Sequence, residues 1–276
     1  APQETAELLR AAGLVDAVLD FSGVESLGPH PPPWNQAPPG LAIDLHGRGP
    51  QSHRLLTALQ PHRLVAFACA EVGNPGPPWW SDEHEAARWS RLVADTFGVT
   101  CDPCDVVLPA PVVGSPEPGA VVLHPGAAHR SRQWPVDRFA AVARALSAAG
   151  ERVVLTGTAA ERQLAVEVAV AAGLDDSALL AGTTSLATLA AFVAEARLVV
   201  CGDTGVAHLA SAYATPSVLL FGPTAPARWG PPSHGPHTVI WKGNGAGDPL
   251  GELVDTALLS IDVDEVLHHI AQRLAG

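Results

Sequence analysis

The C-terminal half of the chain alternates short apolar runs with longer amphipathic segments, and this pattern predicts strands that alternate with helices. Strands are expected at 121–124, 152–156, 198–201 and 217–221, and helices at 136–149, 159–172, 185–196 and 262–274. Gly150 and Gly173 follow two of these helices as stop signals. Because parallel strands need helical crossovers, the alternation predicts a Rossmann-like α/β domain with a parallel sheet.

The N-terminal half carries a weaker form of the same pattern. Strands are expected at 15–19, 41–45 and 63–68, helices at 5–12, 51–59 and 82–97, and proline-rich loops at 28–40 and 73–80. This half starts with a helix that no strand precedes, so we expect its first strand and loop to lie upstream of the sequence. The chain is therefore divided into an N-terminal α/β domain (1–111), a linker (112–119), a C-terminal domain (120–261) and a closing helix (262–276).

Composition narrows the function. The chain has 276 residues, of which 47% are hydrophobic and 16% charged, as expected of a soluble protein with two cores. Its net charge of −12 argues against nucleic acid as a partner, because such proteins need a basic face to displace counterions. There is no signal-peptide pattern and no apolar run long enough to span a bilayer, so a cytoplasmic location is expected.

The cysteines do not suggest a metal site. Cys101 and Cys104 form a CxxC, but no second pair completes a zinc site, and Cys201 falls in a predicted buried strand. We expect free thiols and no bound metal.

The turn after the strand at 198–201 is the first candidate for chemistry. A helix N-terminus exposes backbone N–H groups and the positive end of the helix dipole, and both attract anions. Asp203 is placed as the N-cap, Thr204 offers a hydroxyl, and Gly205 lets a ligand approach the backbone. His208 lies four residues after Thr204, on the same helix face. The alternative is a plain capped helix with a buried histidine.

The loop at 124–135, HPGAAHRSRQWP, is the second candidate. Its small residues, Ala127 and Ala128 among them, let the backbone lie close to a ligand, and Arg130 and Arg132 offer guanidinium groups to phosphate oxygens. The alternative is a solvated turn whose arginines pair with surface acids.

The loop at 157–161, GTAAE, is the third. Glu161 can accept hydrogen bonds from ribose hydroxyls, as acids do at this edge of nucleotide-binding folds, or it can simply favour the helix dipole. Because all three loops follow parallel strands, they should meet at one sheet edge. Together they predict a pocket for the diphosphate of a nucleotide.

These motifs resemble those of glycosyltransferase family 9, the ADP-heptose:lipopolysaccharide heptosyltransferases. The resemblance rests on the following segments: HPGAAHRSRQWP, GTAAER, TTSLATLAAFVAEARLVVCGDTGVAHLA, LLFGPT and, in the N-terminal half, IDLHGRGPQS. It covers the C-terminal domain well and the N-terminal domain more loosely.

The resemblance implies a GT-B architecture, in which two Rossmann-like domains face a cleft, and an inverting sugar transfer that needs no metal and no cofactor. The donor would be a nucleotide-diphosphate sugar such as ADP-heptose, held by the C-terminal domain. The acceptor would be a glycan or glycolipid, which brings a peripheral contact with a membrane. The implied donor-binding residues are Ala127 and Ala128 through their backbone, Arg132 on the phosphates, Glu161 on the ribose, Thr184 beside the base, and Asp203, Thr204, Gly205 and His208 on the sugar diphosphate.

One part of the family pattern is missing. The family's general base is an aspartate in a loop after the first N-terminal strand, which is absent here, so the catalytic residue is unassigned. Asp44 is the nearest substitute by location, but a carboxylate that ends a strand is more often structural. A nucleotide-sugar-binding protein without transferase activity therefore remains the alternative. A sugar-nucleotide epimerase is more distant, because it would need a pair of catalytic acids.

Overall fold

The computed structural model of the chain describes residues 3–19 and 34–275. It divides into two compact units, Ala1–Asp105 and Val106–Gly276, each of which is treated by itself. The segment 112–119, expected to be a linker, lies within the second unit. Residues 28–33 of the first proline-rich loop lie outside the described residues.

The second unit is built on a five-stranded parallel sheet with strand order β4-β3-β5-β6-β7. The strands are β3 (Val121–His124), β4 (Val153–Leu155), β5 (Leu198–Gly202), β6 (Ser217–Phe221) and β7 (His237–Trp241). Every residue of β3 to β6 is buried, which is why their sequences are continuous apolar runs. The four expected strands are confirmed. Strand β7 was missed, because this edge strand is mostly half-buried and its sequence, HTVIW, starts with polar residues.

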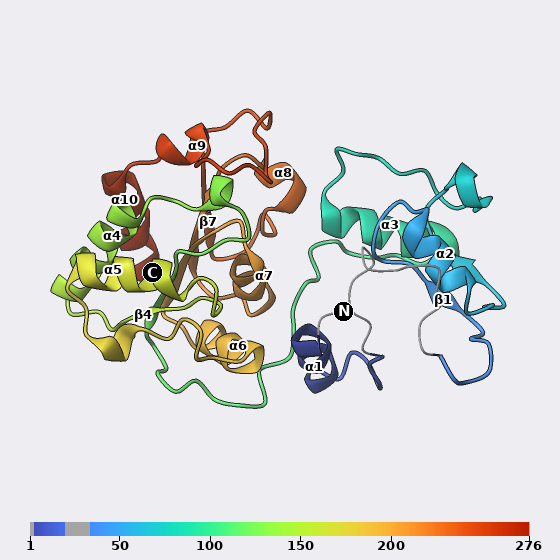
Figure 1. Cartoon of the computed structure of the whole chain (residues 1–276), viewed down its shortest axis with the longest axis horizontal. Helices are drawn as coiled ribbons and strands as arrows, with labels where there is room; N and C mark the ends of the chain where they lie inside the picture. Colours follow the sequence, from blue (N-terminus) through green and yellow to red (C-terminus); the bar gives the residue numbers. More distant parts are fainter. Residues whose placement is uncertain (1–2, 20–33, 276) are drawn as a thin grey trace. The chain divides into compact units, whose positions relative to one another are not determined.

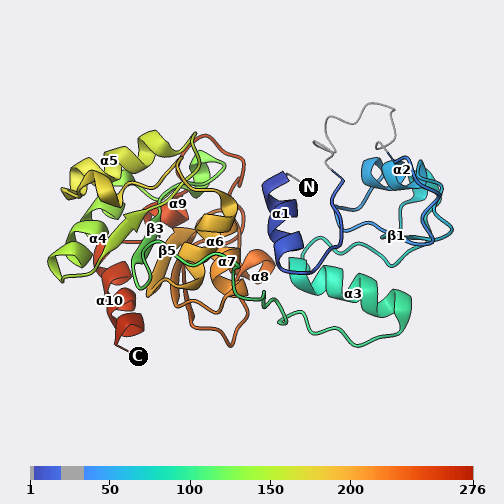
Figure 2. The ribbon, with the colours of Figure 1, turned by 90° about the horizontal axis from the view of Figure 1, so that it is seen from below.

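Helices cover both faces of this sheet (Figures 1 and 2). On one face lie α4 (Val136–Ala148), α5 (Arg162–Ala172) and α10 (Val263–Leu274); on the other lie α6 (Leu186–Ala194) and α7 (Gly205–Ala212). Ser185 caps α6 by accepting a hydrogen bond from the Thr188 N–H. Short helices α8 (Pro226–Trp229) and α9 (Thr256–Leu259) follow β6 and β7, and the 3₁₀ turns η3 (Arg130–Arg132) and η4 (Asp176–Ala178) lie in loops.

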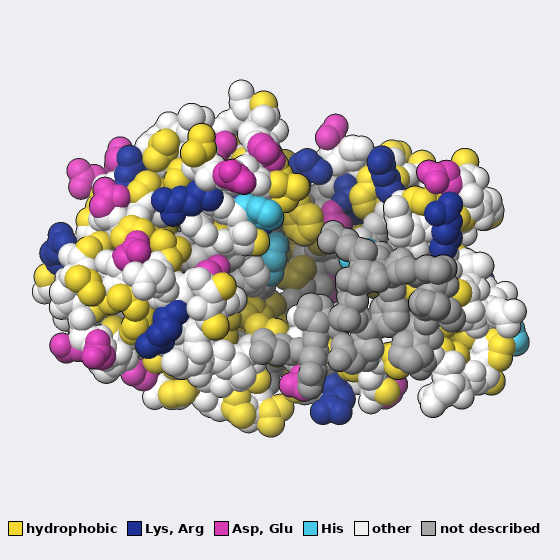
Figure 3. Space-filling model, viewed as in Figure 1, with side chains coloured by type: hydrophobic (Ala, Val, Ile, Leu, Met, Phe, Trp, Pro, Cys, Tyr) yellow, Lys and Arg dark blue, Asp and Glu magenta, His cyan; other side chains and the backbone are white. Residues whose placement is uncertain are grey.

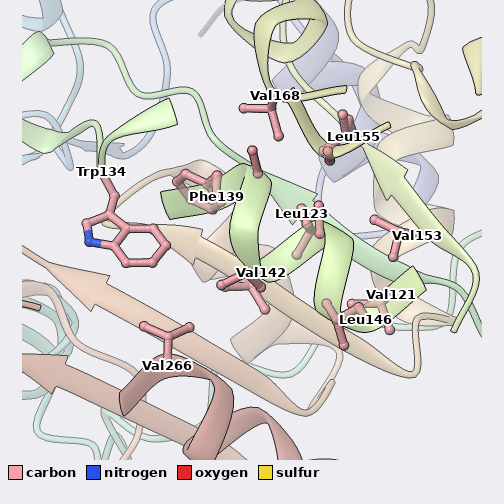
Figure 4. Close-up of a cluster of buried hydrophobic side chains, with 14 of the residues drawn as sticks. Val121, Leu123, Trp134, Phe139, Val142, Leu146, Val153, Leu155, Val168 and Val266 are labelled. Carbon is pink, nitrogen blue, oxygen red and sulfur yellow. The ribbon is translucent and has the colours of Figure 1, made fainter. Parts of the chain in front are cut away.

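The main core lies between the sheet and the layer of α4, α5 and α10 (Figure 4). Alternate strand residues, Leu123 and Leu155 among them, point into it, and α4 adds Phe139. Trp134 packs edge to face on Phe139 at 5.2 Å, and its indole N–H donates to the Ile261 carbonyl at 3.1 Å. The W-P step that opens α4 therefore fixes the end of the loop after β3.

The first unit has a smaller sheet. Its elements are α1 (Gln3–Ala11), β1 (Ala42–Ile43), α2 (Gln51–Thr57), β2 (Leu64–Val65), η2 (Ala70–Val72) and α3 (Glu85–Phe97), with β1 parallel to β2. Its core is Val65, Phe67 and Leu92, with Trp79 and Trp89 packed against them. The expected strand at 15–19 is wrong: these residues form no ladder, and Val18 and Leu19 are exposed. Within 3–19 and 34–275, no helix has the length and apolarity needed to cross a membrane.

We expect Leu123→Ala to lower the free energy of unfolding by about 3 kcal/mol, because it leaves a cavity in the core beneath the inner strand β3. Urea denaturation measures the change. The matched control is Leu253→Ala, since Leu253 is 83% exposed and should change stability by less than about 0.5 kcal/mol. Equal losses in the two variants would contradict the assigned core.

Candidate functional site

The strand order places the loops after β3 and β5 side by side at the carboxyl edge of the sheet. The chain runs from β3 to β4 on one side and then returns to β5 on the other side of β3. Ligands of open parallel sheets bind at such a reversal of strand order. The backbones meet closely here, since a Cβ at Gly202 would lie 3.0 Å from the Arg132 carbonyl oxygen.

Asp203 lies in the turn between β5 and α7. The expectation that it caps α7 is wrong: Thr204 is the N-cap residue, in an extended conformation and without a side-chain cap hydrogen bond. The Asp203 side chain is buried instead, with Oδ2 3.9 Å from Arg132 Nη1. Burial raises the pKa of Asp203, while Arg132, His208 and a hydrogen bond with Thr224 oppose the shift.

The first turn of α7 presents an open surface. Gly205 is exposed, and a Cβ built on it would meet no atom within 4 Å. His208, one turn further along the helix, is exposed and not buried as the alternative interpretation required. Its ring lies 6.1 Å from that of Trp229. A ligand can therefore reach the N-terminus of α7.

The loop after β3 directs one of its two arginines into the site. Arg132 Nη1 donates to the Asp203 carbonyl oxygen at 3.4 Å, and Arg132 Nε is buried with no hydrogen-bond partner among the described residues. Arg130 is exposed and donates to Gln133 Oε1 at 3.2 Å. Ala127 is buried and Ala128 exposed. Of the two arginines, Arg132 is the one that can meet an anion at the turn.

Glu161 precedes α5 and folds back over the loop after β3. Its Oε2 accepts hydrogen bonds from the Thr158 N–H at 2.8 Å and the Thr158 hydroxyl at 2.9 Å. A Cβ at Gly126 would lie 2.3 Å from the Glu161 carboxyl carbon, so a larger residue there would displace the carboxylate from this position. The loops after β3 and β4 are thereby joined.

His124, at the end of β3, also faces Glu161 and was missed by the sequence analysis. Its Nε2 lies 4.0 Å from Glu161 Oε2, and its Nδ1 shares a hydrogen bond with the Thr156 hydroxyl at 3.0 Å. Burial lowers the pKa of His124, against the opposing charge of Glu161, and keeps the imidazole neutral. A polar residue that ends a buried strand was the available signal.

The segment just before Thr184 is bonded to the loop after β4. The Gly182 N–H donates to the Gly157 carbonyl at 2.9 Å, and Arg162 donates to the Ala181 carbonyl at 2.6 Å. These bonds hold the segment before α6 against the loop after β4. The loops that carry the expected binding residues therefore lie at the carboxyl edge of the sheet, with Arg132 beside Asp203 and Glu161 beside Gly126.

Other polar groups lie elsewhere. Asp44 is buried after β1, where Oδ1 accepts the His46 N–H at 3.0 Å and Oδ2 lies 3.5 Å from His53 Nε2.

A cavity of about 360 Å³ beyond β6 and β7, with Lys242 and Asp255 on its wall, contains none of the expected site residues. Across 3–19 and 34–275, no group of three or more His, Cys, Asp or Glu side chains could hold a metal ion. All four cysteines are free thiols.

The charges around the site are local. Acidic and basic side chains are interspersed over the face of the second unit seen in Figure 3, with no single basic patch. This face therefore offers no broad basic track for a polyanion, in keeping with the net charge of −12.

Three comparisons with known proteins point to the same family. The sequence model described as glycosyltransferase family 9 (heptosyltransferase) matches residues 113–251. Lipopolysaccharide heptosyltransferase 1 of Pseudomonas aeruginosa PAO1 is 41% identical over 114 residues, which cover 40% of this chain and 31% of that protein. The chain thus spans about a third of the length of this curated relative.

Two solved structures share the fold. The glycosyltransferase family 9 protein of Veillonella parvula DSM 2008 aligns with a TM-score of 0.68 and 16% identity over 100% of this chain and 80% of that one. Escherichia coli heptosyltransferase WaaC with ADP-2-deoxy-2-fluoro heptose aligns with a TM-score of 0.61 and 18% identity over 98% and 87%. The α/β GT-B fold class is confirmed.

The buried Asp203 carboxyl leads to a prediction about stability. Because its pKa is raised in the folded protein, its contribution to stability is full below its usual pKa of 3.8 and is lost as the pH rises through the raised value. Asp203→Asn is neutral at every pH, so it should melt at the same temperature as the unmodified protein or higher at pH 7. The difference should shrink as the pH falls toward 3.8. A lower melting temperature at pH 7 would show that the fold needs the carboxylate.

Proposed function

Because the chain belongs to glycosyltransferase family 9, the heptosyltransferases, we propose that it transfers a sugar, a heptose, from a nucleotide-diphosphate donor to a glycan or glycolipid acceptor. The observation that carries the proposal is the meeting of the loops after β3, β4 and β5 around Arg132, Glu161 and the N-terminus of α7. Along the sheet edge these loops come in the order β4, β3, β5, and a nucleotide sugar presents its ribose, its diphosphate and its sugar in one line. Escherichia coli WaaC, which shares the fold, was solved with ADP.

The donor's nucleoside belongs at the β4 end of the edge. Glu161 has a second carboxylate oxygen, Oε1, besides the one held by Thr158, and this oxygen can accept from a ribose hydroxyl. Thr184, which follows the segment that is bonded to this loop, flanks the base. Ala127 and Ala128 offer backbone groups only.

The diphosphate belongs between Arg132 and the turn of Asp203, Thr204 and Gly205. Arg132 Nε is a buried donor with no partner among the described residues, and such a group costs about 1–3 kcal/mol unless a ligand satisfies it. The α7 N-terminus adds backbone N–H groups and a positive dipole end. Asp203 holds the Arg132 guanidinium at this place.

The chemistry follows from this distribution of charge. An acceptor hydroxyl attacks the anomeric carbon on the face opposite the diphosphate, the bond to the phosphate oxygen breaks, and the configuration inverts. Negative charge then grows on the leaving diphosphate, where Arg132, the α7 N-terminus and His208 stabilise it without a metal ion. The hydroxyl proton passes to a general base that the loops after β3, β4 and β5 do not supply.

The alternative is a protein that binds a nucleotide sugar without transferring it, which the unassigned base favours. Incubation of the protein with ADP-heptose and a glycolipid acceptor separates the two. The proposal requires acceptor-dependent release of ADP. Binding of the donor without release would favour the alternative, whereas no binding would exclude both.

The acceptor would bring the protein to a membrane surface, on the cytoplasmic side where nucleotide sugars are available.

We expect Arg132→Ala to weaken ADP binding by about 1.5–3 kcal/mol, since it removes a charge-assisted contact with the phosphates. Isothermal titration calorimetry measures the change. Arg130→Ala is the matched control, because Arg130 belongs to the same loop but is exposed and bonded to Gln133. Unchanged affinity in Arg132→Ala, or equal losses in both variants, would contradict the phosphate site.

The ribose contact can be tested by comparing two ligands, with and without ribose hydroxyls, on the unmodified protein and on a Glu161 variant. If Glu161 accepts from the ribose hydroxyls, the unmodified protein should bind ADP about tenfold more tightly than 2′,3′-dideoxy-ADP. In Glu161→Ala this preference should vanish, because the hydroxyls lose their partner. A preference that survives the substitution would place the ribose elsewhere.

A further inference from the structure

We propose that Trp229 forms the wall of the donor pocket that contacts the transferred sugar ring. This inference rests on the proposed function, since it needs a nucleotide sugar in the pocket. The inference gives a role to the loop after β6, for which the sequence motifs indicated none.

The order of the strands gives the direction in which the donor lies. Along the sheet edge, the loop after β4 carries Glu161, the loop after β3 carries Arg132, and the turn after β5 carries Asp203. A nucleotide sugar is a linear molecule in which base, ribose, diphosphate and sugar follow one another. With ribose at β4 and diphosphate between β3 and β5, the next place along the edge is the loop after β6.

The spacing of the strands agrees with a sugar ring at the loop after β6. Neighbouring strands lie about 4.8 Å apart, so the step from β5 to β6 is close to the width of one sugar ring. Three such steps, roughly 14 Å, separate β4 from β6, which is comparable with an extended nucleotide sugar.

The loop after β6 is fastened to the phosphate turn. Thr224 forms a side-chain hydrogen bond with Asp203, and Trp241 Nε1 donates to the Gly222 carbonyl at 3.0 Å. A Cβ at Gly222 would lie 2.8 Å from Leu258 Cγ, so the loop lies tightly on the core at its start. The segment therefore has a fixed position beside the turn that would hold the diphosphate.

Trp229 ends α8 in this segment and faces the same turn. Its ring lies 6.1 Å from the ring of His208, with the two planes tilted by 54°, and the indole is 38% exposed. The Gly230 N–H closes α8 by donating to the Pro226 carbonyl at 2.6 Å, and a Cβ at Gly230 would lie 2.6 Å from that oxygen. A glycine directly after the tryptophan thus sets the end of the helix that carries the indole.

The chemistry of this wall fits a sugar. A pyranose ring has an apolar face of C–H groups and a rim of hydroxyls, and an indole offers a flat apolar surface. The imidazole of His208 adds a nitrogen that can hydrogen-bond a hydroxyl beside the indole. Small-molecule sites commonly combine aromatic walls with a few polar groups in this way. The ligand class is therefore the hydroxylated ring attached to the donor's second phosphate.

The test compares a donor analogue with its sugar-free part. Calorimetry with ADP-2-deoxy-2-fluoro heptose and with ADP is done on the unmodified protein and on Trp229→Ala. The variant should bind the analogue about tenfold more weakly and ADP within about twofold of the unmodified protein, because only the analogue carries the sugar. Trp229→Phe should recover most of the loss, since it restores an aromatic face.

Trp80→Ala is the matched control: Trp80 is a 53% exposed tryptophan in the first unit, and its loss should leave both affinities unchanged. Melting temperatures show that each variant is folded. Equal losses for ADP and the analogue, or no loss for either, would overturn the assignment of Trp229 while leaving nucleotide binding in place. If Trp229→Ala bound the analogue with unchanged affinity but transferred the sugar to the acceptor more slowly, Trp229 would contact the acceptor. That result would also overturn the assignment of Trp229 to the donor sugar. If the unmodified protein bound neither ligand, the proposed function and this inference would fall together.

Discussion

The proposed donor pocket depends on the parallel pairing of β3 with β5. In this register His124 lies opposite Cys201, so both strands end at the same height and release their loops at the same edge. The loop from β3 can then place Arg132 on the carbonyl of Asp203, although the two residues are far apart in the chain. A shift of the register by one residue would move every side chain to the other face and separate the two loops.

Close backbone approach is the second constraint, and it is met by glycines in the loops. A Cβ at Gly126 would collide with Glu161, one at Gly202 would crowd the Arg132 carbonyl, and one at Gly222 would crowd the Ser131 carbonyl at 3.3 Å. Each of these glycines follows or ends a strand. The loop after β3 thus lies across the ends of its neighbours at distances where a larger residue would force its neighbours to shift. The resulting fixed geometry keeps Arg132 and Glu161 in place before any ligand arrives.

Sequence periodicity predicted the C-terminal sheet because buried parallel strands leave a simple signal, and β3 and β6 have the predicted bounds. The three loops could also be found, since they follow strands. What could not be predicted was orientation. Asp203 was expected to cap α7, but tertiary contacts with Arg132 and Thr224 hold its side chain instead. Trp229 carried no local signal at all, because its place beside His208 depends on the neighbouring positions of β5 and β6.

The local balance of charge makes the proposed diphosphate site compatible with a net charge of −12. A single lysine would be a strongly hydrated point charge, whereas the Arg132 guanidinium can contact Asp203 on one side and retain a donor, Nε, for another partner. Burial raises the pKa of Asp203, while Arg132 beside it opposes the shift, so the carboxyl and the guanidinium are coupled at this turn. The positive end of α7 lies next to this pair and adds partial charge that needs no side chain. The attraction for a diphosphate is therefore confined to one turn, where it can also act on the charge that develops as the diphosphate leaves.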